Sequence, residues 1–114
     1  MDNEERTCVL RDRFAFDFSD KYHDEIRQLL LKELNYFQAG SSEYIRFLCG
    51  YLFCIGDTED LSLIRRAKYD INFDVGCMVD GEWIECLEVG DKENEYTRNR
   101  KELIEEFIFY YENF

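Results

Sequence analysis

Residues 44–55 read YIRFLCGYLFCI, a stretch whose single charge is Arg46. A helix over residues 43–55 would carry one apolar face formed by Ile45, Leu48, Cys49 and Leu52. Its other faces carry aromatic rings, those of Tyr44, Phe47, Tyr51 and Phe53. A helix that is apolar on every side is normally buried. We therefore expect this segment to be the central helix of the fold.

The residues before the central helix carry a second helical pattern. Residues 20–38 repeat apolar side chains with the 3.6-residue period of one helical face. Ser19 or Asp20 can cap the start of this helix, and Gly40 suits the left-handed conformation that often ends one. The expected inward face consists of Tyr22, Ile26, Leu29, Leu30, Leu34 and Phe37.

The residues after the central helix begin with a clear boundary. Gly56 ends the central helix, and the acids of residues 57–60 suit the positive N-terminal end of the next one. That next helix runs to about Ala67. Residues 69–76 alternate over too short a distance to indicate a strand, so we expect an irregular connection there.

The C-terminal part of the chain carries two further predicted helices. A short one begins at Asp80 or Gly81, ends before Gly90, and holds Trp83, Ile84 and Leu87. The last one, about residues 94–112, has the clearest amphipathic pattern in the chain. Its expected buried face consists of Leu103, Ile104, Phe107, Ile108 and Tyr111.

The N-terminal residues 1–19 fit two conformations. Residues 14–18 are either an extended piece lying on the bundle or the end of a first helix, and the sequence leaves both open. Short connections between successive helices favour antiparallel neighbours. We predict one all-α domain over residues 1–114, a small bundle of stacked antiparallel helix pairs. A short solenoid is the narrower version of this prediction, although no exact repeat is visible.

The net charge of the chain limits the classes of molecule that it is expected to bind. The sequence has 14 basic and 26 acidic residues, a formal net charge of −12 at pH 7. Phosphates would be repelled, which argues against direct nucleic-acid binding, whereas a basic protein is the electrostatic complement. No stretch of about 18 uncharged apolar residues indicates a membrane span, and residues 1–6 lack the pattern of a signal peptide. We expect a cytoplasmic protein and predict no obligate oligomer.

The five cysteines are odd in number and match no zinc-binding spacing. They are Cys8, Cys49, Cys54, Cys77 and Cys86. Without a leader sequence, they are expected to be free thiols in a reducing compartment. Cys49 and Cys54 lie in the central apolar stretch, where cysteine acts as a small buried hydrophobe.

The sequence offers no catalytic constellation. It contains no phosphate-binding glycine loop, nucleophile elbow or HExxH motif, and its only histidine, His23, is expected to be exposed near a helix start. Asp57, Glu59 and Asp60 are close together but lack the spacing of a calcium loop. Helix capping explains Asp57 and Asp60. We therefore predict no enzyme, metal or cofactor.

The most informative charge pattern is a stretch of acids without a base. Residues 69–91 contain no Lys or Arg. One interpretation is a solvated acidic surface; the other is a docking face for a basic partner, with Tyr69, Phe73, Met78 and Trp83 as apolar anchors. Trp83 also fits a place in the core. The predicted partner-binding residues are Asp70, Asp74, Asp80, Glu82, Trp83, Glu85, Glu88 and Asp91.

Short motifs in residues 44–90 support a resemblance. They are the run 44–52, the pattern GDTEDLSLI over 56–64, Ala67-Lys68, and NFDVG over 72–76. This set resembles small bacterial immunity proteins of contact-dependent growth inhibition and other polymorphic toxin systems. The resemblance implies a non-enzymatic protein that binds and neutralises one cognate toxin domain, often a nuclease. It supplies no catalytic residues.

Within this resemblance, two sets of polar residues differ in their expected role. The shared residues are expected to serve as caps and turns of the fold: Asp57, Asp60, Asn72 and Asp74. Glu82, Glu85 and Glu88 are the better candidates for contact with one particular partner. A toxin that holds phosphates must be basic around its active site, which agrees with an acidic inhibitor.

Three other functions remain open from the sequence. One is a helical-repeat adaptor between proteins, unrelated to any toxin. Another is a metal-dependent enzyme using Asp57, Glu59 and Asp60 with Asp74 or Asp80, which would require those acids to converge. The last is a DNA mimic, which would require acids in phosphate-like rows.

Overall fold

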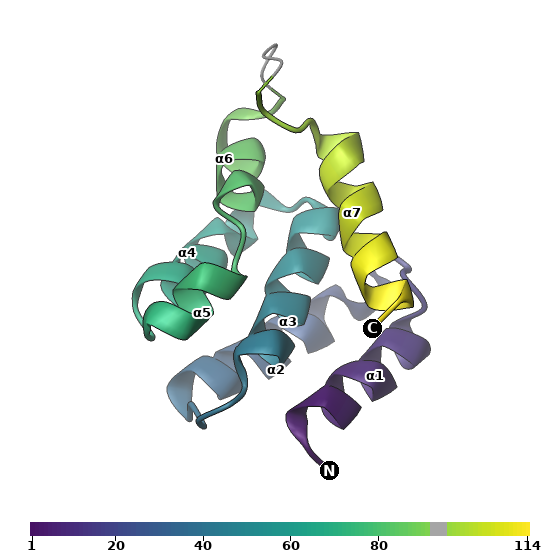
Figure 1. The fold of residues 1–114 in the computed structure, drawn as a ribbon. Coiled ribbons are helices and arrows are strands. Elements are labelled where there is room, and N and C mark those ends of the chain that lie inside the picture. Colours follow the sequence, from purple (N-terminus) through teal and green to yellow (C-terminus); the bar gives the residue numbers. More distant parts are fainter. Residues whose placement is uncertain (92–95) are drawn as a thin grey trace.

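A computed structural model describes residues 1–91 and 96–114, and in these ranges the chain is all-α with no strand (Figure 1). The α-helices are α1 (Asn3–Phe14), α2 (His23–Asn35), α3 (Ser42–Ile55), α4 (Leu61–Tyr69), α5 (Phe73–Met78), α6 (Gly81–Val89) and α7 (Arg100–Glu112). Short 3-10 turns over Asp20–Tyr22 and Thr58–Asp60 lead into α2 and α4. The prediction of a small all-α bundle is confirmed.

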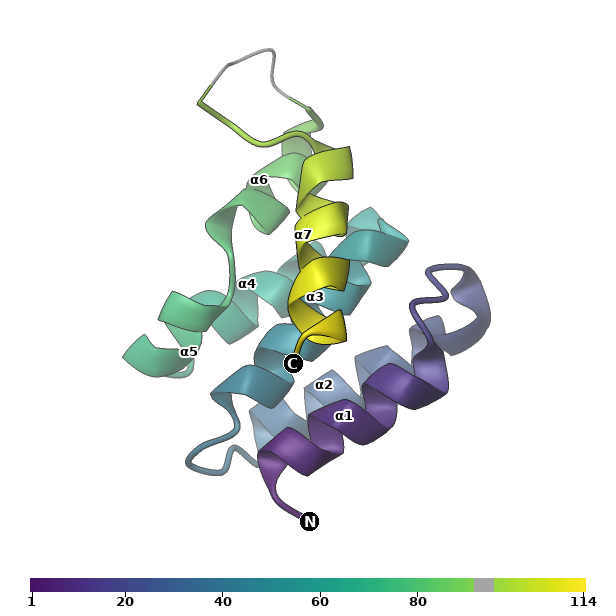
Figure 2. The same cartoon turned by 45° about the vertical axis from the view of Figure 1, so that its right-hand side comes forward.

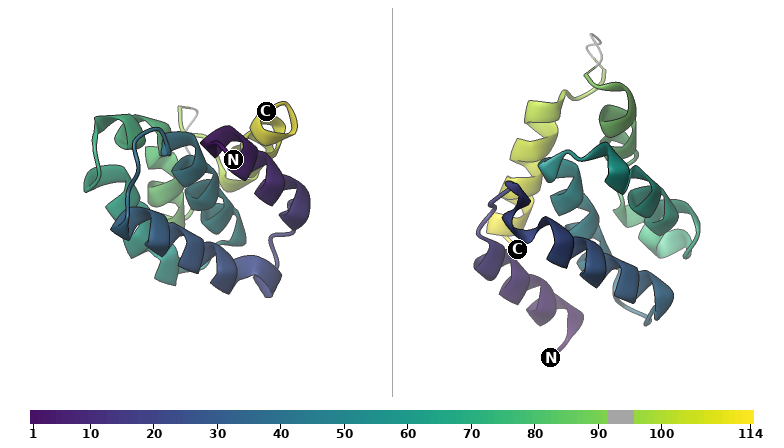
Figure 3. Two further views of the ribbon diagram at one scale, coloured as in Figure 1. Left: turned by 90° about the horizontal axis from the view of Figure 1, so that it is seen from below. Right: turned by 180° about the vertical axis from the view of Figure 1, so that it is seen from behind.

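Helix α3 is the centre of the packing, as its sequence predicts. From Tyr44 to Cys54 every residue except Arg46 is buried. Helices α1, α2, α4, α5 and α6 all pack against α3, and Figures 2 and 3 show the bundle gathered around it. In a solenoid each repeat touches only its neighbours. Packing around one shared helix is the observed form of the bundle instead.

An aromatic cluster joins α3, α6 and α7. The Phe107 ring of α7 lies 5.9 Å from Phe47, 6.1 Å from Tyr51 and 6.2 Å from Trp83, measured between ring centroids. Gly50 makes this approach possible, because a Cβ at that position would lie 2.6 Å from Cδ2 of Phe107 and 2.9 Å from Cη2 of Trp83. Such distances are well inside van der Waals contact. A side chain at position 50 therefore conflicts with the observed packing.

The expected buried face of α7 is confirmed in its main part. Leu103, Phe107 and Tyr111 are buried, whereas Ile104 and Ile108 are half-buried at the edges of the same face. The helix begins later than predicted, at Arg100, because Asn99 caps it and forms a reciprocal capping box with Glu102. Residues 94 and 95 of the predicted helix lie outside the described residues.

Two other predicted boundaries are corrected. The helix expected over residues 20–38 ends at Asn35, and Gly40 adopts a φ of +88° in the following turn without capping it. The connection expected at 69–76 contains the start of α5, whose first turn is capped by the Asn72 side chain accepting a hydrogen bond from the Val75 amide. This helix has six residues, too few to show a helical period in the sequence.

The N-terminal segment is helical over α1 and then reverses. Ala15 and Phe16 have φ values of 51° and 55°, the left-handed region that turns the chain back. The Phe14 ring is fully buried, and the Tyr51 hydroxyl lies 3.2 Å and 3.1 Å from the carbonyl oxygens of Phe14 and Asp17. Each of the two alternatives for residues 14–18 therefore describes part of the segment: Phe14 ends the first helix, whereas residues 15–18 are not helical and place Phe16 and Phe18 against the core.

Candidate functional site

The predicted acidic stretch spans α5, α6 and the start of the connection to α7, and one of its residues is not at the surface. The Trp83 side chain is only 2% exposed and stacks on Phe53 with ring centroids 6.2 Å apart. Trp83 therefore belongs to the core, and its place among the partner-binding residues is corrected. The seven acidic members of the set are all exposed or half-buried: Asp70, Asp74, Asp80, Glu82, Glu85, Glu88 and Asp91.

Arg98 neutralises part of this stretch. Its Nη2 lies 2.7 Å from Asp80 Oδ2, its Nε donates to Glu82 Oε2 at 2.7 Å, and its Nη1 is paired with Glu106 of α7. Asp80 also caps α6 by accepting a hydrogen bond from the Glu82 amide. The stretch contains no base in the sequence, but folding brings Arg98 against it. Asp80 and Glu82 hold the segment before α7 against α6.

Two further acids of the stretch have partners within the fold. Glu88 forms an ion pair with Arg65 of α4. Asp91 accepts a hydrogen bond of 2.6 Å from the backbone amide of Arg100, at the first residue of α7. Four of the predicted contact residues thus have a structural role, which the base-free pattern in the sequence does not reveal.

The remaining acids of the stretch lie near exposed rings on α4 and α5. Tyr69 is 66% exposed and Phe73 is 82% exposed, while the third predicted anchor, Met78, is half-buried. Tyr69 and Phe73 line one open groove together with Asp70. Tyr69 also lines a second groove between α4 and α6. We name this region the α4–α5 surface, made of Tyr69, Asp70, Phe73 and Asp74.

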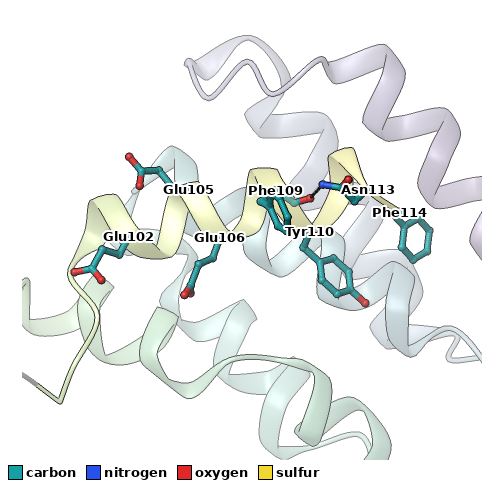
Figure 4. Close-up of a pocket in the computed structure, with 7 residues that line it drawn as sticks. All are labelled: Glu102, Glu105, Glu106, Phe109, Tyr110, Asn113 and Phe114. Carbon is teal, nitrogen blue, oxygen red and sulfur yellow. Dashed lines mark hydrogen bonds between the residues drawn. The ribbon is translucent and has the colours of Figure 1, made fainter.

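A second exposed surface, which the base-free charge pattern in the sequence does not indicate, lies on α7. It is an open groove on the outer side of the helix, which we name the α7 face; Figure 4 shows its glutamates toward one end and its rings toward the other. The lining residues are Glu102, Glu105, Glu106, Phe109, Tyr110, Asn113 and Phe114. Phe109 is 68% exposed and Tyr110 40%. The sequence does contain one indication of the α7 face, because Phe109 and Tyr110 fall outside the buried face formed by residues 103, 107 and 111.

Contacts to α3 fix the aromatic end of the α7 face. The Tyr110 hydroxyl donates to Glu43 Oε2 at 3.2 Å, and the Arg46 guanidinium lies 4.1 Å from the centre of the Tyr110 ring. Burial and the adjacent Glu43 carboxylate both raise the pKa of Tyr110. Arg46 also donates to the Tyr111 hydroxyl at 2.9 Å. Tyr110 is consequently held in one orientation before any partner arrives.

A cluster around Asp60 corrects two predictions. Asp60 is fully buried, with Oδ2 at 2.5 Å from His23 Nε2 and Oδ1 at 3.1 Å from Arg27 Nε. It makes no side-chain cap at the start of α4, unlike Asp57, which accepts a hydrogen bond from the Glu59 amide. His23 is half-buried and not exposed. Burial raises the pKa of Asp60, although the neighbouring His23 and Arg27 act in the opposite direction.

The same cluster contains the one grouping in residues 1–91 and 96–114 that could be tested as a metal centre. Ligand atoms of His23, Asp57 and Asp60 lie within 4.8 Å of one another. The two acids face different ring nitrogens of His23: Asp57 Oδ2 lies 4.0 Å from Nδ1, whereas Asp60 Oδ2 contacts Nε2. Arg27 already places a positive charge on Asp60. The geometry fits a clamp between the start of α2 and the start of α4 better than a cation site.

The cysteines are all unpaired, as predicted. Cys49 and Cys54 are buried in α3, and burial raises the pKa of both thiols. Cys77 is exposed on α5. The buried thiols therefore act as packing groups, because the reactive form of cysteine is the thiolate.

Comparison with known proteins adds no relative. No protein-family model, no curated protein and no solved structure matches the chain. None of the helices in the described residues is long and apolar enough to cross a membrane. Function is therefore inferred from the surfaces described above and from the resemblance in the sequence.

Proposed function

We propose that this protein binds a basic toxin domain and neutralises it, as immunity proteins do, without catalysing a reaction. The observation that carries the proposal is the presence of exposed aromatic rings among carboxylates. Phe73 lies between Asp70 and Asp74 in the chain, and Phe109 follows Glu105 and Glu106 by about one helical turn. Large exposed aromatic side chains are typical of protein-binding sites, where they supply most of the contact energy.

The charge of the chain supports a basic partner. A net charge of −12 produces an attractive field for a basic protein and speeds its diffusional encounter. A toxin that cleaves nucleic acid must hold phosphates and is therefore basic at its active site. Binding there would exclude the substrate by charge and by bulk. Such inhibition needs no cofactor and no reactive group on the inhibitor.

The alternative of a helical-repeat adaptor receives less support. Repeat adaptors depend on units that stack on their neighbours and form an extended concave surface. The packing here gathers around α3, and the Cα radius of gyration is 13.3 Å, near the value of about 13 Å expected for a compact domain of about 100 residues.

The decisive test uses the gene beside the one that encodes this protein. We expect it to encode a basic toxin domain that arrests growth of a bacterial host when produced alone. Co-production of this protein should restore growth, and the two purified proteins should elute together from a size-exclusion column. An unrelated acidic protein of similar size and charge is the control. Arrest that persists despite co-production, or separate elution, would refute the proposal.

A further inference from the structure

We propose that the α7 face binds a basic, partly apolar segment of the partner, with Lys or Arg side chains against its glutamates and an apolar side chain against Phe109. The identity of the partner rests on the proposed function, whereas the position of the site rests on the geometry of α7. This site differs from the 69–91 stretch that the sequence indicates.

The α7 face has two chemically different ends. Glu102, Glu105 and Glu106 occupy its first half, and the rings of Phe109 and Phe114 lie toward its end (Figure 4). A helix rises 1.5 Å per residue, so Glu102 and Phe109 are separated by about 10 Å along the axis. A matching segment needs a basic cluster and an apolar side chain about 10 Å apart. In a helical partner this is a spacing of about two turns, and in a strand about three residues.

The Tyr110 side chain at the aromatic end is ordered before binding. Tyr110 is held by Glu43 and Arg46 of α3, as described above. The Asn113 side chain donates to the Phe109 carbonyl oxygen at 2.8 Å and closes the last turn of α7. Interfaces gain affinity when their anchors need no further ordering. Tyrosine and arginine are also enriched at binding hot spots.

Glu105 and Glu106 remain able to exchange partners, whereas Glu102 also accepts the capping-box hydrogen bond from the Asn99 amide. Glu105 lies 3.9 Å from Lys101, and both side chains are largely exposed. Glu106 is paired with Arg98 and is also exposed. Exposed ion pairs contribute little free energy, so a cationic side chain of a partner can replace or join them. A second copy of this chain is disfavoured as the occupant, because two molecules of charge −12 repel each other.

The acids of the 69–91 stretch are less available. Asp80 and Glu82 bind Arg98, Glu88 pairs with Arg65, and Asp91 binds the amide of Arg100. Contact with a partner at Asp80, Glu82 or Asp91 would compete with bonds that hold α6 and α7 together, whereas the exposed Glu88–Arg65 pair can exchange in the same way as the pairs on α7. Asp70 and Asp74 on the α4–α5 surface have no such role and provide the natural comparison.

The experiment compares two matched pairs of variants. On the α7 face they are the double variant Glu102→Gln/Glu105→Gln and the single variant Phe109→Ala; Gln at position 102 preserves the capping box. On the α4–α5 surface they are Asp70→Asn/Asp74→Asn and Phe73→Ala. Both pairs remove two charges and one exposed ring. Far-ultraviolet circular dichroism and melting curves establish that all four variants are folded.

The first readout is the affinity for the toxin domain that the neighbouring gene is expected to encode, measured by calorimetry at 50 mM and 500 mM salt. Phe109→Ala should weaken binding by about 10-fold or more, as expected for a hot-spot ring. The α7 charge variant should weaken it about 3- to 10-fold at 50 mM salt and less at 500 mM, where charges are screened. The α4–α5 variants should change it by less than about 3-fold. Equal losses in both pairs, or larger losses on the α4–α5 surface, would overturn the inference.

The second readout separates this inference from the proposed function. The probe is a synthetic peptide with four lysines followed, two helical turns later, by Leu and Phe, and a scrambled peptide is its control. Amide chemical shifts of the labelled protein should change along α7 with the ordered peptide and not with the scrambled one. If the toxin domain does not bind, the proposed function fails, and the peptide experiment by itself then tests whether α7 is a binding site. Shifts spread over the whole acidic surface would refute the α7 site.

Discussion

Substituting Gly50 by alanine should destabilise this protein, although the same change stabilises most helices. Gly50 lies in the interior of α3, where alanine normally gains about 1 kcal/mol over glycine. At this position the new Cβ would lie 2.6 Å from Cδ2 of Phe107 and 2.9 Å from Cη2 of Trp83. Both rings are buried and surrounded by other side chains. A shift of either ring would disturb the ring contacts that join α3, α6 and α7.

The size of the effect follows from two opposing contributions. Adding a carbon to a filled core costs about 1–3 kcal/mol, and contact with two fixed rings favours the upper value. After the gain of about 1 kcal/mol from helix propensity, the unfolding free energy should fall by about 2 kcal/mol. For a chain of this length that corresponds to a melting temperature lower by roughly 8 °C. Urea unfolding followed by the fluorescence of the single tryptophan, Trp83, measures the loss of unfolding free energy directly.

Gly81→Ala is the matched control. A Cβ at this first residue of α6 would lie 3.6 Å from Lys68 Cε, an ordinary contact, so stability should stay the same or rise. A second test combines Gly50→Ala with Phe107→Leu. If the clash is with the ring, the double variant should lose at least about 0.5 kcal/mol less than the two single changes added together. Strict additivity, or a more stable Gly50→Ala, would show that the proposed steric conflict does not exist.

Three further outcomes are expected. Phe107→Ala should lower the unfolding free energy by about 3–5 kcal/mol, and a loss below 1 kcal/mol would mean that α7 is peripheral. Titration of the native protein with a thiol reagent should show Cys77 reacting first and fewer than five fast equivalents, against five after denaturation; five fast equivalents in the native state would disprove burial of Cys49 and Cys54. Burial raises the pKa of Asp60, so the folded state binds this proton more tightly than the unfolded chain. Its contribution to the unfolding free energy should therefore fall as the pH rises from about 4, and a stability difference between Asp60→Asn and the wild type that does not vary with pH would contradict this.

The sequence predicted the central part of the fold because the relevant signals are local. All-round apolarity marks α3 as the buried helix, and Gly56, with a φ of +87°, ends it where expected. The inward face of α7 follows from its period alone. Helix α5 could not be recognised in the same way, because it is too short to repeat, although Asn72 was present as a cap.

The candidate surfaces were harder to predict because their chemistry depends on residues distant in the chain. A stretch without bases acquires Arg98 and Arg65 only when α4, α6 and α7 meet. Asp60 has the position of a cap in the sequence, but its partner His23 is 37 residues away. Charge counted along a segment therefore overestimates the charge that the folded surface presents.

The two sides of α7 connect stability to binding. The inner side places Phe107 against Gly50 of α3, and the outer side presents Phe109 and Tyr110 two and three residues later. Helix α3 also supplies Glu43 and Arg46, which orient Tyr110 and lie in the first turns of that helix. A displacement of α7 by a larger residue at position 50 would therefore shift Tyr110 relative to α3. The exposed rings of the α4–α5 surface are not held by α3 residues next to this cluster in the way that Tyr110 is. Core changes near Gly50 should thus alter an α7-bound partner more than one bound at Tyr69 and Phe73.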